Sequence, residues 1–93
     1  MTLKTTPFDI VEFIQAPEDA VEYLKVVMEG ANSDEIRAAL NNIVRARGVK
    51  KIATETGLTR AAIYKALGDN GNPTLSTLLA LTKALGVRLS VAA

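Results

Sequence analysis

The chain has 93 residues, of which 48% are hydrophobic, with no cysteine, no histidine and a formal net charge of +1. This length supports a single domain with a modest core, and the apolar content excludes a disordered tail. The missing thiol and imidazole groups exclude disulfide bonds and the usual catalytic bases and zinc sites, so we expect no enzyme activity and no cofactor. Without a signal-peptide core or a membrane-spanning apolar run, we expect a cytoplasmic protein with no membrane partner.

The charges are divided unevenly between the two halves of the chain. Residues 1–47 carry five Lys/Arg and eight Asp/Glu, a net charge of −3, whereas residues 48–93 carry six and two, a net charge of +4. A clustered basic excess is the electrostatic footprint of nucleic-acid binding. We therefore expect the second half to approach a polyanion and the acidic half to be suited to a basic protein.

Residues 1–16 form the first segment, with Pro7 and an apolar cluster whose spacing does not decide between a helix and a strand. We interpret residues 1–16 as an N-terminal arm extended over the helices, and residues 17–93 as the domain. Because both phenylalanines of the chain, Phe8 and Phe13, lie in this arm, we expect part of it to be ordered.

Two amphipathic helices are predicted next. The first begins at Pro17, with acidic residues in its first turn, and ends at a left-handed Gly30. Its buried stripe comprises Val21, Leu24, Val27 and Met28. Ser33 is expected to cap the second helix, which Gly48 closes. The inner face of the second helix comprises Ile36, Ala39 or Leu40, Ile43, Val44 and Ala46.

Residues 49–67 (VKKIATETGLTRAAIYKAL) predict a helix, a sharp turn and a second helix. Gly57 supplies a positive φ at the turn, and the Thr59 hydroxyl can cap the helix that follows. Ile63 falls ten residues after Ala53, where it would plug the joint between the helices. This spacing is typical of a helix-turn-helix, whose second helix enters the DNA major groove.

The outward face of the second helix distinguishes DNA binding from simple helix packing, because many helical hairpins share the same joint residues. This face carries long hydrogen-bond donors and small residues, namely Thr59, Arg60, Ala61, Tyr64 and Lys65. The guanidinium of Arg60 matches the acceptor pair of guanine, and a slim helix can approach base edges. We therefore predict that this face reads double-stranded DNA.

After a loop at residues 68–73, Thr74 is expected to cap the last helix, which Gly86 stops. Its predicted core stripe comprises Leu75, Leu78, Leu79, Thr82 and Leu85. Residues 87–91 then alternate apolar and polar side chains, as in a β-strand.

A single strand in a helical domain needs a partner for its backbone groups. We expect Val87, Leu89 and Val91 to pair antiparallel with the same strand of a second copy, forming a homodimer. Such a dimer would bind a palindromic operator with half-sites about 34 Å apart. The alternatives are a frayed tail or pairing with the N-terminal arm.

With these motifs placed, the chain resembles the addiction-module antidote proteins, which are HigA-like antitoxins of type II toxin–antitoxin modules. The runs ARARGVKKIATETGLTRAAIYKAL and GNPTLSTLLALTKALGVRLSV carry the resemblance, together with the upstream segment PFDIVEFIQAPEDAVEYLKVVMEG. The resemblance implies an all-α, lambda-repressor-like (Xre/Cro-type) five-helix bundle containing the helix-turn-helix, followed here by the C-terminal strand.

The resemblance also implies the function: neutralisation of a RelE/HigB-like toxin and repression of the protein's own operon. By position in the family's motif, Lys50 and Lys51 would contact phosphate, and Asn70 and Asn72 would reach the DNA backbone. Many relatives have a glutamine near the start of the first motif helix, where this chain has Val49 and two lysines.

For the toxin-binding surface we predict a contribution from the acidic N-terminal residues Asp9, Glu12, Glu18, Asp19 and Glu22. Two other functions remain open at this point. One is a stand-alone phage-type repressor, and the other is a protein-interaction antidote without DNA binding.

Overall fold

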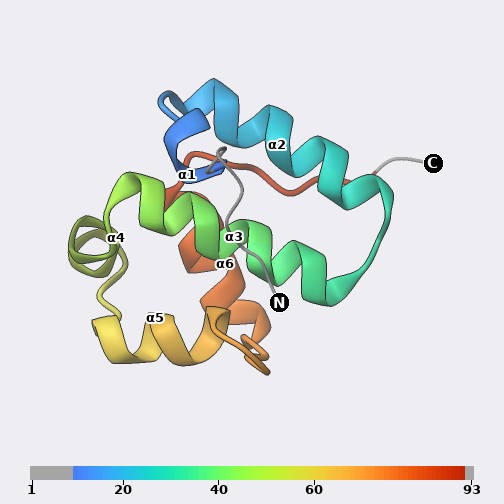
Figure 1. The fold of residues 1–93 in the computed structure, drawn as a ribbon. Helices are drawn as coiled ribbons and strands as arrows, with labels where there is room; N and C mark the ends of the chain where they lie inside the picture. Colours follow the sequence, from blue (N-terminus) through green and yellow to red (C-terminus); the bar gives the residue numbers. More distant parts are fainter. Residues whose placement is uncertain (1–9, 92–93) are drawn as a thin grey trace.

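The computed structural model describes residues 10–91, and this part of the chain is all-helical with no β-strand (Figure 1). Six helices follow one another: α1 (Ile10–Phe13), α2 (Pro17–Glu29), α3 (Ser33–Arg47), α4 (Val49–Thr56), α5 (Arg60–Leu67) and α6 (Leu75–Ala84). None of these helices in residues 10–91 is long and apolar enough to span a bilayer.

Helix α3 is the centre of the bundle, since it contacts α1, α2, α4 and α5, while α6 packs on α4. Figure 1 shows α2 and α3 as an antiparallel pair, with α5 across α3 from α2. The shared core is aliphatic and comprises Ile14, Ala20, Leu24, Ala39, Leu40, Ile43, Val44, Ile52, Ile63, Leu67, Leu81 and Leu85. Burial of this core stabilises helices too short to persist alone.

Helix α2 begins at Pro17 as predicted, and the Asp19 carboxylate accepts hydrogen bonds from the backbone N–H groups of Gln15 and Ala16, both at 3.0 Å. Two details of its predicted face and end are wrong. Met28 is 46% exposed, because the buried face is centred on Ala20 and Leu24.

The predicted left-handed terminator after α2 is also misplaced. Gly30 is right-handed (φ −77°), and Ala31 takes the positive φ of 52° instead. The N-terminal cap of α3 is also one residue earlier than predicted. The Asn32 side chain, rather than that of Ser33, accepts a hydrogen bond from the backbone N–H of Glu35 at 3.0 Å. Asparagine and serine cap equally well, so composition alone does not choose between adjacent positions.

The α4–turn–α5 unit forms at the predicted residues. Gly57 is left-handed (φ 79°) and its N–H donates to the Ala53 carbonyl at 2.9 Å, which ends α4. The Thr59 hydroxyl then accepts the N–H of Ala62 at 3.0 Å, which starts α5. Ile63 is fully buried in the core that also contains Ile52 of α4, and Ala53 packs against that core. This burial is what the predicted role of Ile63 between the two helices requires.

Helix α6 begins at the predicted cap, where Thr74 Oγ1 accepts the N–H of Thr77 at 3.2 Å, but its predicted core stripe is partly wrong. Leu81 is fully buried, whereas Leu75 and Leu79 are 70% and 47% exposed. Leucine recurs along this helix at spacings that fit two neighbouring faces. Packing against α4 selects the face that carries Leu81 and Leu85.

The two ends of the chain differ from the prediction. Part of the expected extended arm is helix α1, and Ile14 after it is buried at 5% exposure, while Phe8 and Asp9 lie outside the described residues. The described C-terminal residues 87–91 form no strand, and the bundle has six helices in residues 10–91 rather than five. Residues 10–91 contain no neighbouring strand with which a ladder could form, and Val87 packs on the core with its N–H bonded to the Thr82 carbonyl.

Candidate nucleic-acid interface

Helix α5 is buried along one side and exposed along the other. Ile63 and Leu67 lie in the core, where their exposure is 0% and 1%. All five residues predicted to read DNA are on the exposed side: Thr59, Arg60, Ala61, Tyr64 and Lys65. At 3.6 residues per turn, Arg60 lies beside Tyr64, and Ala61 lies beside Lys65. The exposed face therefore carries a cationic side chain and the small Ala61 in its first turn, and Tyr64 and Lys65 one turn later.

The cations of this face have no acidic partner within the described chain. The ion pairs found in residues 10–91 join Lys25 to Glu22 on α2 at 3.4 Å and Arg37 to Asp34 on α3 at 3.5 Å. Neither Arg60 nor Lys65 has a carboxylate within 4 Å in that range. Because no internal ion pair must be broken, both side chains are available to a polyanion.

Lys50 and Lys51 are exposed in the first turn of α4. This position is unfavourable for helix stability, because the N-terminal end of a helix dipole is positive and Gly48 supplies no side-chain cap. Lysines beside the positive end of a helix dipole suit the binding of an anion. No hydrogen bond or ion pair within residues 10–91 links these lysines to the α5 face.

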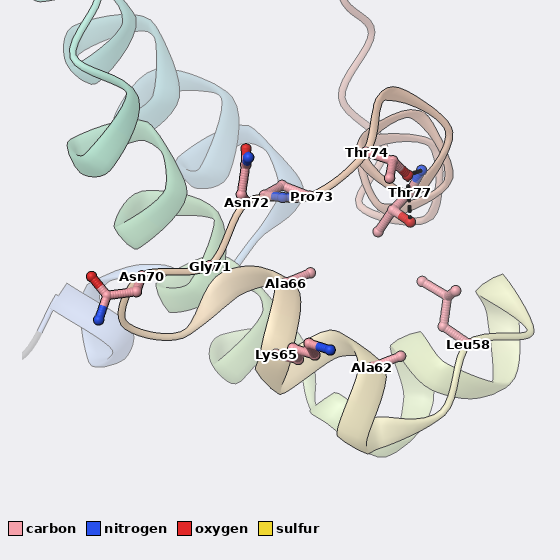
Figure 2. Close-up of a pocket in the computed structure, with 10 residues that line it drawn as sticks. All are labelled: Leu58, Ala62, Lys65, Ala66, Asn70, Gly71, Asn72, Pro73, Thr74 and Thr77. Carbon is pink, nitrogen blue, oxygen red and sulfur yellow. Dashed lines mark hydrogen bonds between the residues drawn. The ribbon is translucent and has the colours of Figure 1, made fainter.

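A shallow hollow of about 360 Å³ separates α5 from the start of α6 (Figure 2). It brings together three of the predicted site residues, Lys65, Asn70 and Asn72. Across it, Thr74 donates to Thr77 at 3.0 Å, which places two hydroxyl groups at the α6 N-terminus. The hollow is therefore polar along one border and lined by alanines of α5 along the other.

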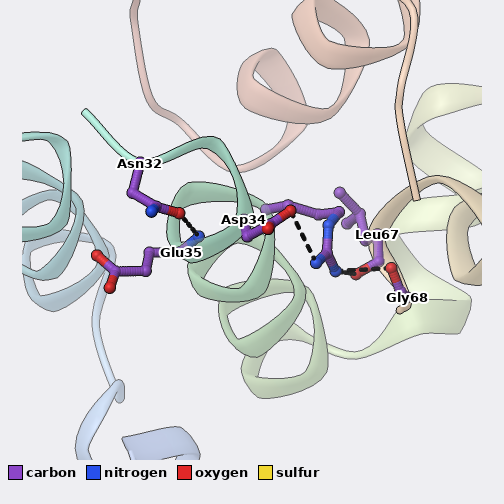
Figure 3. Close-up of polar contacts among 6 residues, drawn as sticks. Asn32, Asp34, Glu35, Leu67 and Gly68 are labelled. Atoms are coloured by element: carbon purple, nitrogen blue, oxygen red, sulfur yellow. Dashed lines mark hydrogen bonds and ion pairs between the residues drawn. The ribbon is translucent and has the colours of Figure 1, made fainter. Parts of the chain in front are cut away.

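Sequence reasoning missed Arg37, a residue of α3 whose guanidinium contacts the end of α5. Figure 3 shows the accepting residues, Leu67 and Gly68, with the hydrogen bonds that reach them drawn as dashed lines. The Arg37 side chain is only 14% exposed, and its guanidinium donates to the carbonyls of Leu67 and Gly68 at 3.3 and 2.6 Å. A signal for this role exists in the sequence: Arg37 precedes Leu40 and Val44 of the buried stripe by three and seven residues. Residues at these spacings share one face of a helix, so the spacing predicts that Arg37 lies on the core-facing side of α3.

The three residues predicted to form the dimer strand differ in exposure. Val87 is partly buried against its own core, whereas Leu89 is 42% and Val91 is 100% exposed. Leu89 and Val87 also line a hollow beside Leu79 of α6. The exposed apolar surface at this end thus comes from α6 as well as from the C-terminal segment.

No group of three metal-binding side chains comes together among residues 10–91. What the described surface offers is an exposed helix with cationic ends, next to a polar hollow and a second positively charged helix start. This arrangement is suited to recognising another macromolecule by direct contact.

Comparison with known proteins identifies the family. Residues 4–93 match the family described as "Probable addiction module antidote protein". An uncharacterized protein of Haemophilus influenzae is 36% identical over 91 residues, which cover 98% of this chain and 94% of that protein. No solved structure is significantly similar to the chain. The chain belongs to the family of addiction module antidote proteins.

Proposed function

We propose that this protein is a DNA-binding antitoxin that represses its own operon through α5 and neutralises a toxin. The observation that carries the DNA half is the exposed face of α5, where Arg60 and Lys65 have no ion-pair partner within residues 10–91. A helix that served only to pack would not need this donor set on its open side. The α4–turn–α5 geometry supports placing it in a lambda-repressor-like, Xre/Cro-type fold.

In this proposal, Arg60 and Tyr64 meet base edges in the major groove, with Thr59 and Ala61 at the entering end and Lys65 near the phosphates. Asn70 and Asn72 reach the backbone beyond the end of α5. The positive start of α4 gives Lys50 and Lys51 a phosphate-binding role, which offsets their unfavourable position on the helix dipole. We propose action by binding, without catalysis.

Membership of the antidote family implies a cognate toxin partner. We propose that the toxin is RelE/HigB-like and that it contacts the acidic N-terminal surface. Within this proposed surface, the Asp19 carboxylate already caps α2, and Glu22 lies 3.4 Å from Lys25 in an exposed ion pair. Glu12 and Glu18 are exposed and make no ion pair within residues 10–91, so they carry the proposed contact.

We further propose that the C-terminal segment joins two copies. Residues 87–91 leave the apolar side chains of Leu89 and Val91 exposed, and Leu89 lines the same hollow as the exposed Leu79 of α6. Antiparallel pairing of this segment with a second copy would satisfy its backbone groups and cover these side chains. The resulting two-fold arrangement would present two α5 helices to a palindromic operator.

Fluorescence anisotropy with a labelled duplex from upstream of the gene tests the DNA half, at about 100 mM salt with a scrambled duplex as competitor. We expect specific binding, and we expect the double variant Arg60→Ala/Lys65→Ala to lose it. The matched control is Lys25→Ala/Arg45→Ala, which removes the same charge from exposed positions on α2 and α3. Equal losses in both double variants, or no binding by the wild type, would refute DNA recognition by α5.

Co-expression with the neighbouring reading frame tests the toxin half. A complex with a small basic protein that is toxic alone supports the antitoxin. DNA binding without such a neighbour would indicate a stand-alone repressor, and a toxin complex without DNA binding would indicate a protein-interaction antidote.

A further inference from the structure

The C-terminal end of α5 depends on a side chain from another helix. An eight-residue helix is too short to be stable alone, and its last carbonyls have no partner within the helix. The Gly68 N–H closes one of them by donating to the Tyr64 carbonyl at 2.8 Å. The carbonyls of Leu67 and Gly68 are bonded instead by the guanidinium of Arg37, at 3.3 and 2.6 Å (Figure 3).

Arg37 is placed to hold this end firmly. Its side chain is 14% exposed and lies on α3, the central helix of the bundle, about thirty residues away in sequence. A cation at the negative end of a helix dipole is favourable, and hydrogen bonds from a charged donor are stronger than neutral ones. Its other contact, Asp34 at 3.5 Å, contributes little because that carboxylate is 85% exposed.

The loop after α5 packs directly against the end of that helix, so a displacement of Gly68 would also displace the loop. The Gly71 N–H donates to the Gly68 carbonyl at 2.8 Å, so this oxygen accepts from both Arg37 and the loop. A Cβ at Gly71 would lie 2.2 Å from the Ala66 carbonyl oxygen, which shows how tightly the loop returns onto the helix. The same loop carries Asn70 and Asn72.

We infer that Arg37 is a positioning residue for operator recognition, which fixes the end of α5 and the 68–72 loop against α3. This inference rests on the proposed DNA-binding function. Reading base edges requires an exact placement of the helix in the groove, whereas contacts to phosphate depend mainly on charge. Loss of the hydrogen bonds from Arg37 to the Leu67 and Gly68 carbonyls should therefore weaken binding to the operator more than binding to an unrelated duplex.

The test compares Arg37→Met, Arg37→Lys and the control Arg45→Met. Arg45 lies on the same helix but is exposed, and within residues 10–91 its guanidinium hydrogen-bonds to the Asn42 side chain alone, at 3.2 Å. The control therefore removes the same charge from α3. Amide hydrogen exchange of the DNA-free protein measures how firmly the Arg37 hydrogen bonds hold the end of α5. Fluorescence anisotropy measures the affinity for the operator and for a scrambled duplex.

We expect Arg37→Met to speed exchange of the amides at residues 68–72 and to weaken operator binding roughly tenfold, which corresponds to about 1.4 kcal/mol. Its binding to scrambled duplex should stay within about twofold of Arg45→Met, the range of an ordinary surface substitution. Arg37→Lys should lie between the wild type and Arg37→Met, because lysine keeps the charge but not the planar donor set. If Arg37→Met does not fold, Arg37→Lys is compared with the wild type and with Arg45→Met in its place.

Equal exchange rates in the Arg37 and Arg45 variants would refute the claim that Arg37 holds the end of α5. Faster exchange with unchanged operator affinity would overturn the positioning role, as would equal losses on operator and scrambled duplex. A wild-type protein that binds no duplex would refute the proposed function and with it the recognition half of the inference. In that case the exchange rates would still decide whether Arg37 holds α5.

Discussion

Gly57 and Gly71 are both required in the region of α5, but for different physical reasons that substitution can separate. Gly57 has a φ of +79°, and nothing lies within 4 Å of the place its Cβ would occupy. Gly71 is not among the glycines with positive φ, yet a Cβ there would lie 2.2 Å from the Ala66 carbonyl oxygen. A side chain at position 57 is opposed by its backbone dihedral angle, and one at position 71 by a collision.

The expected magnitudes follow from these causes. Gly57→Ala should lower the free energy of unfolding by about 1–2 kcal/mol, the cost of a left-handed residue with a Cβ. Gly57→Asn should recover part of this loss, because asparagine tolerates that conformation. Gly71→Ala must move the loop until the Cβ–oxygen distance exceeds 3.0 Å, and overpacking of this kind costs about 1–3 kcal/mol. Gly71→Asn is larger and should recover nothing.

Urea and thermal unfolding of the four variants measure the difference. For a domain of this size, 1 kcal/mol corresponds to a shift in Tm of roughly 4–8 °C, so the effects are well resolved. If Gly57→Asn is no more stable than Gly57→Ala, or if Gly71→Asn is more stable than Gly71→Ala, the two causes have been assigned wrongly.

Three further predictions concern binding. Arg60→Ala should cost about 1–3 kcal/mol on the operator and relax specificity at one base pair, measured by competition with operator variants; unchanged affinity would remove Arg60 from the reading face. Lys50→Ala should weaken operator and unrelated duplex alike and reduce the slope of log affinity against log salt by about 1, and an unaltered slope would contradict a phosphate contact. Leu89→Asp should weaken the homodimer in sedimentation experiments, with Arg88→Asp as an exposed neighbouring control. A Leu89→Asp protein that still sediments as a dimer would place the interface elsewhere.

Features set by residues close in sequence could be predicted. Gly57, Thr59 and Thr74 act where expected, because a left-handed turn or an N-terminal cap involves backbone groups within four residues of the side chain. The exposed donor face of α5 follows from the same local rule, since Ile63 and Leu67 fix which side of the helix is buried.

The sequence by itself therefore determined the turn at Gly57, the caps at Thr59 and Thr74, and the face of α5 that remains open. Only the tertiary structure decided which leucines of α6 are buried, since Leu79 and Leu81 are equally apolar and contact with α4 selects between them. It also decided that Arg37 bonds to the end of α5, because that contact joins atoms about thirty residues apart. Helix periodicity and capping depend on near neighbours, whereas these two outcomes depend on which helices meet.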